Sequence, residues 1–124
     1  MVIVKSSYTI PVYGPHHAPE FHDDDQVAVE VINKGGQPVT VLNFGVRVGR
    51  AKKSGNLFVT SPHILSARLP AAVDPGGEPA RVMVPVDSLR HASREHDVPF
   101  RDMRAWVDLG DGRRVYSDNS IPLK

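Results

Sequence analysis

The sequence contains no cysteine among its 124 residues. This absence excludes a disulfide framework, a thiolate metal site, an iron–sulfur cluster and a cysteine nucleophile. No apolar run approaches the roughly 18 residues that a membrane-spanning helix needs. The first residues also lack the basic stretch followed by an apolar one that marks a signal peptide. We therefore expect a chain that neither spans a membrane nor is exported by a signal peptide.

Sequence signatures of catalysis are also missing. The chain has no Gly-x-Ser-x-Gly elbow, no His-Glu-x-x-His and no phosphate-binding glycine loop. His91 and Glu95 lie four residues apart on a predicted helix, where they can interact without forming an acid–base site. We predict that the protein is not an enzyme and that it uses no cofactor.

What the sequence does have is the composition of one globular domain. Hydrophobic residues make up 40% and charged residues 23%, which is close to the globular average and argues against disorder. The length suits a single core and leaves no room for a second domain. A net charge of +1 and a pI of about 8.1 are low for a nucleic-acid binder.

An alternation of period two dominates the chain and predicts β-strands. Val27, Val29 and Val31 share one face of a strand over residues 26–33. The following Gly35-Gly36 predicts a turn into a second strand, so we expect a hairpin. Within the second strand, residues 38–48, the apolar positions switch face near Val41–Asn43, which predicts a β-bulge.

The rest of the chain alternates short strands with turns. The proline-rich residues 61–79 indicate a loop, with room for a strand near 64–69. Asp87 is a suitable N-cap for a short helix over residues 88–96. Asp111-Gly112 suits a two-residue turn, which would place Tyr116 opposite Val107. The other predicted strands cover residues 57–60, 81–86 and 103–109.

This spacing of strands predicts an all-β fold, an immunoglobulin-like (Ig-like) antiparallel β-sandwich with one short connecting helix. The sandwich would occupy residues 26–124. Residues 1–25 would form an N-terminal extended arm, or an edge strand followed by a polar loop. The order of the strands stays open, because Greek-key and meander connections share the same local signals.

Three groups of turns resemble those of a known class of domain. They are residues 29–41, with an Asn-Lys-Gly-Gly turn before Pro-Val-Thr-Val; Leu69-Pro70 with residues 74–78; and Ala105 to Asp108 ending in Gly-Asp-Gly. Together they resemble small Ig-like domains of high-GC bacteria and their phages. The resemblance covers roughly residues 26–118 and implies the fold rather than a chemistry.

Charge is distributed unevenly along the chain. Four bases, Arg47, Arg50, Lys52 and Lys53, lie at the end of one strand and in the loop after it. They could contact an acidic protein or, less favourably, nucleic acid. Residues 20–30 carry five acids and no base, so the two regions could pair between neighbouring copies or within one chain.

Trp106 and Arg104 are a second candidate for binding. If Ala105 and Val107 face inward, the tryptophan lies on the outer face beside Arg104, and both residue types are enriched in binding hot spots. The alternative is that the N-terminal segment or the short helix covers the indole.

A histidine group near the N-terminus is a weak candidate for metal binding. His16, His17 and His22 lie within a few residues of three aspartates. Imidazole and carboxylate groups can both bind zinc or another divalent ion. Their spacing matches no known metal motif, and loops of this composition are usually solvated, so we predict no metal site.

These observations lead to a non-enzymatic structural or interaction protein. The leading hypothesis is a phage virion component, capsid or tail accessory, or another homo-oligomeric assembly located in a virion or in the cytoplasm. The alternative is a cytoplasmic module that uses the basic loop to bind an acidic protein or nucleic acid. Its partner would be a protein, most simply copies of itself.

Overall fold

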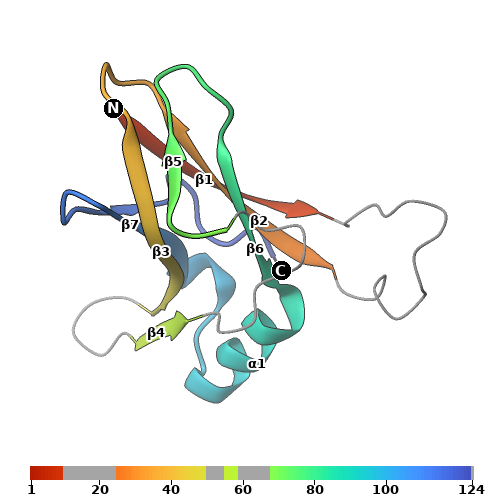
Figure 1. The fold of residues 1–124 in the computed structure, drawn as a ribbon. Helices are drawn as coiled ribbons and strands as arrows, with labels where there is room; N and C mark the ends of the chain where they lie inside the picture. Colours follow the sequence, from red (N-terminus) through yellow and green to blue (C-terminus); the bar gives the residue numbers. More distant parts are fainter. Residues whose placement is uncertain (10–24, 50–54, 59–67, 124) are drawn as a thin grey trace, which may run out of the picture.

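A computed structural model describes residues 1–9, 25–49, 55–58 and 68–123. These residues form two antiparallel sheets that enclose a common apolar core, which is a sandwich-like all-β arrangement (Figure 1). The elements in chain order are β1 (Val2–Thr9), β2 (Gln26–Asn33), β3 (Val39–Val48), β4 (Gly55–Phe58), β5 (Ala71–Val73), β6 (Ala80–Pro85), α1 (Val86–His96), the 3-10 turn η3 (Phe100–Asp102), β7 (Met103–Leu109) and β8 (Arg114–Tyr116).

The first sheet has the strand order β1-β2-β6. Its inward face is built largely from valine because alternate residues of a strand point to the same side. Val29 lies opposite Val82, and Val4 opposite Val31, and all four side chains are buried. The predicted strands over 26–33 and 81–86 are confirmed, and residues 2–9 form the edge strand of this sheet.

The second sheet has the order β4-β3-β7-β8, with β5 paired to the start of β3. The register between β3 and β7 shifts between Val41 and Asn43, so the predicted bulge is confirmed. Leu42 is the extra residue and is exposed, whereas Phe44 and Val46 return to the core. β5 was not predicted, because three residues in a proline-rich run carry almost no periodic signal.

Helix α1 follows β6 directly and closes one end of the core with Leu89 and Ala92 (Figure 1). The predicted N-cap of this helix, Asp87, is wrong by two residues. Pro85 is the N-cap, and Asp87 lies in the first turn, where its charge favours the helix dipole. The first helical amide, Val86 N–H, donates to the carbonyl of Asp25 at the start of β2.

The predicted hairpin between residues 26–33 and 38–48 is wrong. β2 belongs to the first sheet and β3 to the second, so the chain crosses between sheets at residues 34–38. A two-residue primed hairpin turn needs positive φ angles. Neither Gly35 nor Gly36 has one, whereas Gly49, Gly76 and Gly112 do. The two strands therefore face each other across the core.

Asn33 holds this crossing in place. Its side chain is buried, and its Nδ2 donates to the carbonyls of Gln37 and Val73 at 2.7 and 2.9 Å. Its Oδ1 accepts the backbone N–H of Gly35 at 2.9 Å. The Asn33 amide thus satisfies backbone groups of the turn and of β5. These hydrogen bonds connect the end of β2 in the first sheet to β5 in the second sheet.

Asn119 joins the two sheets on the side of β1. Its amide pairs with the backbone of Ser6, since Nδ2 donates to the Ser6 carbonyl at 2.9 Å and Oδ1 accepts the Ser6 N–H at 3.1 Å. Asp118 N–H also donates to the carbonyl of Val4, while Ile121 N–H donates to Met103 of β7. The segment after β8 therefore bonds to both sheets.

The turn between β7 and β8 has three residues rather than the predicted two. Leu109 N–H donates to the Arg113 carbonyl, and Gly112 N–H donates to the Leu109 carbonyl. Gly112 has a φ of 91°, which suits a three-residue loop ending in a left-handed position. The register moves by one residue, so Tyr116 lies opposite Trp106 and not opposite Val107.

Replacing Gly112 with alanine should therefore lower the free energy of unfolding by about 1 kcal/mol, because only glycine adopts this φ without strain. A Cβ at this position would meet no atom within 4 Å, so the cost is one of backbone conformation alone. Gly36→Ala is the matched control, since Gly36 has equally open space and no positive φ. Urea denaturation measures both, and equal stability of the two variants would contradict this account.

Candidate interaction surface

The outward face of the second sheet gathers arginine and aromatic side chains from three neighbouring strands. We call it the arginine face and define it as Arg47 of β3, Arg104, Trp106 and Asp108 of β7, and Arg114 and Tyr116 of β8. Val46, Ala105 and Val107 occupy the core side of the same strands. Strand alternation therefore forces the polar and aromatic members outward together.

Trp106 lies on the outer face, as the alternation predicts, but it is not exposed. Its exposed fraction is 0%, although it is not a member of the main core cluster. The guanidinium of Arg114 lies 3.7 Å from the centre of the indole, a cation–π contact. The prediction of an exposed indole is wrong, and cover by an arginine of the next strand was not among the alternatives.

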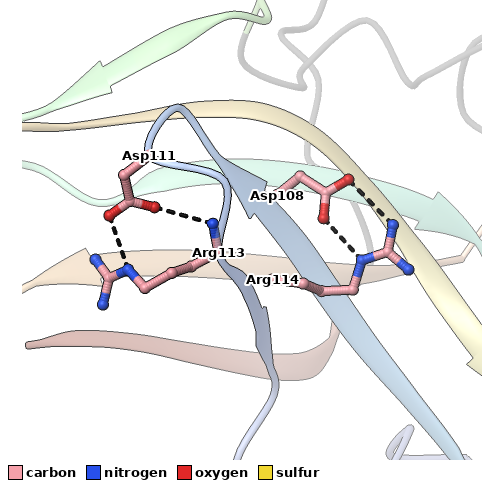
Figure 2. Close-up of polar contacts among 4 residues, drawn as sticks. All are labelled: Asp108, Asp111, Arg113 and Arg114. Atoms are coloured by element: carbon pink, nitrogen blue, oxygen red, sulfur yellow. Dashed lines mark hydrogen bonds and ion pairs between the residues drawn. The ribbon is translucent and has the colours of Figure 1, made fainter.

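Arg114 is held over Trp106 by an ion pair within the hairpin. Its Nε and Nη2 donate to the two carboxylate oxygens of Asp108 at 2.7 and 3.1 Å, which is a bidentate arrangement (Figure 2). The hydrogen bond to Asp108 raises the pKa of Arg114 above its ordinary value, so the guanidinium stays charged. At the tip of the β7–β8 hairpin, the side chain and the backbone N–H of Arg113 both donate to the Asp111 carboxylate (Figure 2). The hydrogen bond from the Arg113 backbone N–H is the main cause of the lowered pKa of Asp111.

Arg47 reaches across a whole strand. Its guanidinium lies 5.0 Å from the centre of the Tyr116 ring, although Arg47 is on β3 and Tyr116 on β8. Because β7 lies between these strands, the Arg47 side chain crosses the outer surface of β7. Its Nε is buried and has no hydrogen-bond partner in the part of the chain that the structure describes.

Arg104 lies directly opposite Arg47 on the neighbouring strand. Its Nη1 donates to the carbonyl of Ser117 at 2.9 Å. Arg47 contacts residue 116 and Arg104 contacts residue 117, so two guanidinium groups from different strands converge on one short segment of the chain.

The charges of the arginine face do not balance. It carries three arginines and one carboxylate, and among the described residues Asp108 forms an ion pair with Arg114 alone. Among the residues in the described ranges, no carboxylate lies within ion-pair distance of Arg47 or Arg104. Arginine presents a planar set of N–H donors that fits carboxylate and phosphate groups, so the face is suited to bind an anion.

The structure brings together three of the residues that the sequence indicated for binding. Arg47, Arg104 and Trp106 share the arginine face. Arg50, Lys52 and Lys53, and the histidines His16, His17 and His22, lie outside the described residues. Arg114 and Tyr116 also belong to this face and were not predicted to do so from the sequence. A three-residue turn at Gly112 would have placed both on the outer side of β8.

The acidic residues of segment 20–30 that the structure describes have partners elsewhere. Asp25 accepts a hydrogen bond from the Tyr8 hydroxyl, and this bond raises the pKa of Tyr8. Glu30 pairs with Arg81 of the same sheet. Neither carboxylate pairs with Arg47, the member of the predicted basic region that the structure describes, so pairing of these two acids with Arg47 within one chain is not found.

The described residues give less support for a metal site, an acid–base site or a membrane span. Within the described ranges, no group of three or more histidine, aspartate or glutamate side chains is placed to hold a metal ion. The Nε2 of His91 and the Oε2 of Glu95 lie 3.2 Å apart on the exposed side of α1, so the two side chains interact as their spacing predicts. No helix in the same part of the chain is both long and apolar enough to cross a membrane.

Fold and surface together define a two-sheet β protein with an arginine-rich, partly neutralised face on one sheet. No family model, no curated protein and no solved structure matches the chain. The function must therefore be argued from this face.

Proposed function

We propose that the chain is a non-enzymatic interaction protein that binds an acidic segment of a partner protein through the arginine face. The observation that carries the proposal is the excess of positive charge on this face, where Arg47 and Arg104 lie opposite each other without a carboxylate from the described residues. Like charges placed directly opposite each other in a sheet lower its stability. Carboxylates of a partner would therefore reduce the electrostatic repulsion between Arg47 and Arg104 that destabilises the free protein.

The proposed fold is Ig-like. The first sheet joins strands 1, 2 and 6, and the second joins strands 4, 3, 7 and 8. This order is the one expected if β1, β2 and β6 correspond to strands A, B and E of an Ig domain, and β3, β7 and β8 to strands C, F and G.

An acidic protein suits the arginine face better than nucleic acid does. Binding of single strands relies on open aromatic rings for base stacking and on a broad basic surface. Here Trp106 is fully covered, and Arg47 lies over the ring of Tyr116. Among the described residues of this face, the unneutralised charge comes from two arginines, which is enough charge to bind a few carboxylates but little for binding a phosphate backbone.

The test is binding of a fluorescently labelled peptide rich in glutamate, followed by fluorescence anisotropy at increasing salt. Wild-type protein should bind at low ionic strength and release the peptide as salt screens the charges. Arg104→Gln should weaken binding by about fivefold, which corresponds to roughly 1 kcal/mol for one charge contact.

Arg113→Gln is the matched control, since it removes the same charge from the turn tip, where Arg113 is already paired with Asp111. It should bind the peptide like wild type. Equal losses in the two variants would show that net charge alone attracts the peptide. A labelled single-stranded oligonucleotide that bound more tightly than the peptide would favour the nucleic-acid alternative.

The setting that we propose is a phage particle or a similar assembly, and its support is the sequence resemblance to Ig-like domains of high-GC bacteria and their phages. In a homo-oligomer the acidic segment would come from another copy. Its residues 20–30 contain five acids, of which Asp25 and Glu30 have partners in their own chain. Light scattering on a sizing column should then show a defined oligomer at low salt that dissociates at high salt. A monomer at both low and high salt concentration would indicate that the acidic segment belongs to a different protein.

A further inference from the structure

The two unpaired arginines of the face have a more specific geometry than a general basic patch. Arg47 and Arg104 are cross-strand neighbours on β3 and β7, and their guanidinium groups converge on residues 116 and 117. The other two arginines of this region, Arg113 and Arg114, each hold an aspartate. The described structure thus provides carboxylates for one pair of arginines and not for the other.

Both guanidinium groups are held in position by neutral contacts. Arg47 lies over the Tyr116 ring, and Arg104 donates one N–H to a backbone carbonyl. These contacts fix the side chains and leave further N–H donors of each guanidinium unused by them. A ligand that binds donors already held in place loses less entropy than one that must order them.

The Nε of Arg47 gives a second, independent observation. It is buried and finds no acceptor among the described residues. A buried donor without a partner has a free-energy cost, and in native proteins such groups are few, so each one needs a specific explanation. Among the described residues, the cation–π contact with Tyr116 therefore holds the Arg47 guanidinium across β7 while its Nε–H remains without an acceptor.

From these observations we infer that Arg47 and Arg104 together form a binding site for one carboxylate group, with the Tyr116 ring beside it. The inference rests on the proposed function and names the chemical group by which the partner is anchored. A carboxylate between the two guanidinium groups would accept N–H donors from both and neutralise the repulsion between them. Its source is either an aspartate or glutamate side chain or the C-terminus of the partner.

Two small carboxylates separate these sources. N-acetyl-glutamate amide carries only the side-chain carboxylate, and N-acetyl-glutamine carries only the terminal one. Each is titrated into ¹⁵N-labelled wild-type protein at constant ionic strength, and the arginine Nε–H signals are followed by NMR. Burial of the Arg47 Nε slows exchange of its proton with water, which makes this signal observable. Through-bond NMR experiments on the wild-type protein assign the signals.

We expect the Arg47 and Arg104 signals to move along one saturating curve with at least one of the two compounds, while the Arg113 signal stays in place. Arg47→Lys keeps the charge and loses the planar donor set, so it should weaken binding by about tenfold. Equal, non-saturating shifts at Arg47, Arg104 and Arg113 would overturn the inference and indicate screening only. The wild-type titration needs no variant to fold.

The two proposals fail separately. If the glutamate-rich peptide binds but neither small carboxylate gives a saturating shift, the carboxylate site is wrong and the broader face remains the binding surface. If the small carboxylates saturate at Arg47 and Arg104 but the acidic peptide does not bind, the site exists and the proposed partner is wrong.

Discussion

Asn33→Asp should lower the free energy of unfolding by about 3 kcal/mol at neutral pH, with little change in the shape of the side chain. The Nδ2 of Asn33 donates to two backbone carbonyls, and an aspartate oxygen in its place would face both as an acceptor. Because the residue is 2% exposed, the new carboxylate would also lose its hydration. The loss should disrupt the crossing between the two sheets. Urea denaturation monitored by circular dichroism measures the change.

The pH dependence gives this prediction a second readout. Burial and the two facing carbonyls raise the pKa of the introduced carboxyl in the folded state above its unfolded value. The folded variant therefore binds a proton more readily than the unfolded variant. Its stability falls as pH rises from the unfolded-state pKa to the folded-state pKa of the introduced carboxyl group, and part of the stability is recovered in acid. Gln37→Glu makes the same amide-to-acid change at an exposed side chain of the same turn. If both variants lost equal stability, the role given to Asn33 would be wrong.

Trp106→Ala should destabilise the protein by about 4 kcal/mol, in the range of fully buried tryptophans of protein cores. This expectation differs from that for a surface residue, although Trp106 lies on the outer face of its sheet. The indole is fully buried and covered by the Arg114 guanidinium, so its removal leaves a cavity beneath an arginine. Thermal or urea unfolding measures the loss, and a change within about 0.5 kcal/mol, as is usual for surface substitutions, would contradict it.

Fluorescence tests the cover of Trp106 more directly, because it is the single tryptophan of the chain. Arg114→Gln removes the guanidinium and should shift the emission to longer wavelength as water reaches the ring. It should cost about 1 kcal/mol, since the cation–π contact and a half-exposed ion pair are lost together. Arg113→Gln, in the same hairpin, should leave the emission unchanged. An unshifted Arg114→Gln spectrum would show that other atoms protect the indole.

The local features of this fold could be predicted from sequence better than the pairing of its strands. Alternation of valine identified β2, β3 and β6, and a switch of face located the bulge at Leu42. Alternation says which side of a strand is apolar but not which strand lies next to it. For that reason the Gly35-Gly36 turn was interpreted as a hairpin, whereas the buried amide of Asn33 directs the chain to the other sheet.

The candidate site shows the same limit on a smaller scale. The outward direction of Arg104 and Trp106 followed from the inward apolar residues of β7. The cover of Trp106 depended on the register of β8, and that register was set by the φ of one glycine, Gly112. A one-residue error there moved Arg114 and Tyr116 off the face to which they belong. Long side chains that cross a strand, as Arg47 does, leave no trace in a sequence pattern.

The pairing of Asn119 with Ser6 bears on the order in which the chain folds. These residues are 113 positions apart, and closing so long a loop carries a large entropic cost before any contact repays it. Contacts of this separation slow folding. During synthesis β1 emerges before the other strands of the two sheets, whereas the segment that joins it to β7 follows β8 in the chain. The edge of β1 that Asn119 covers therefore stays open until the strands of both sheets have been synthesised.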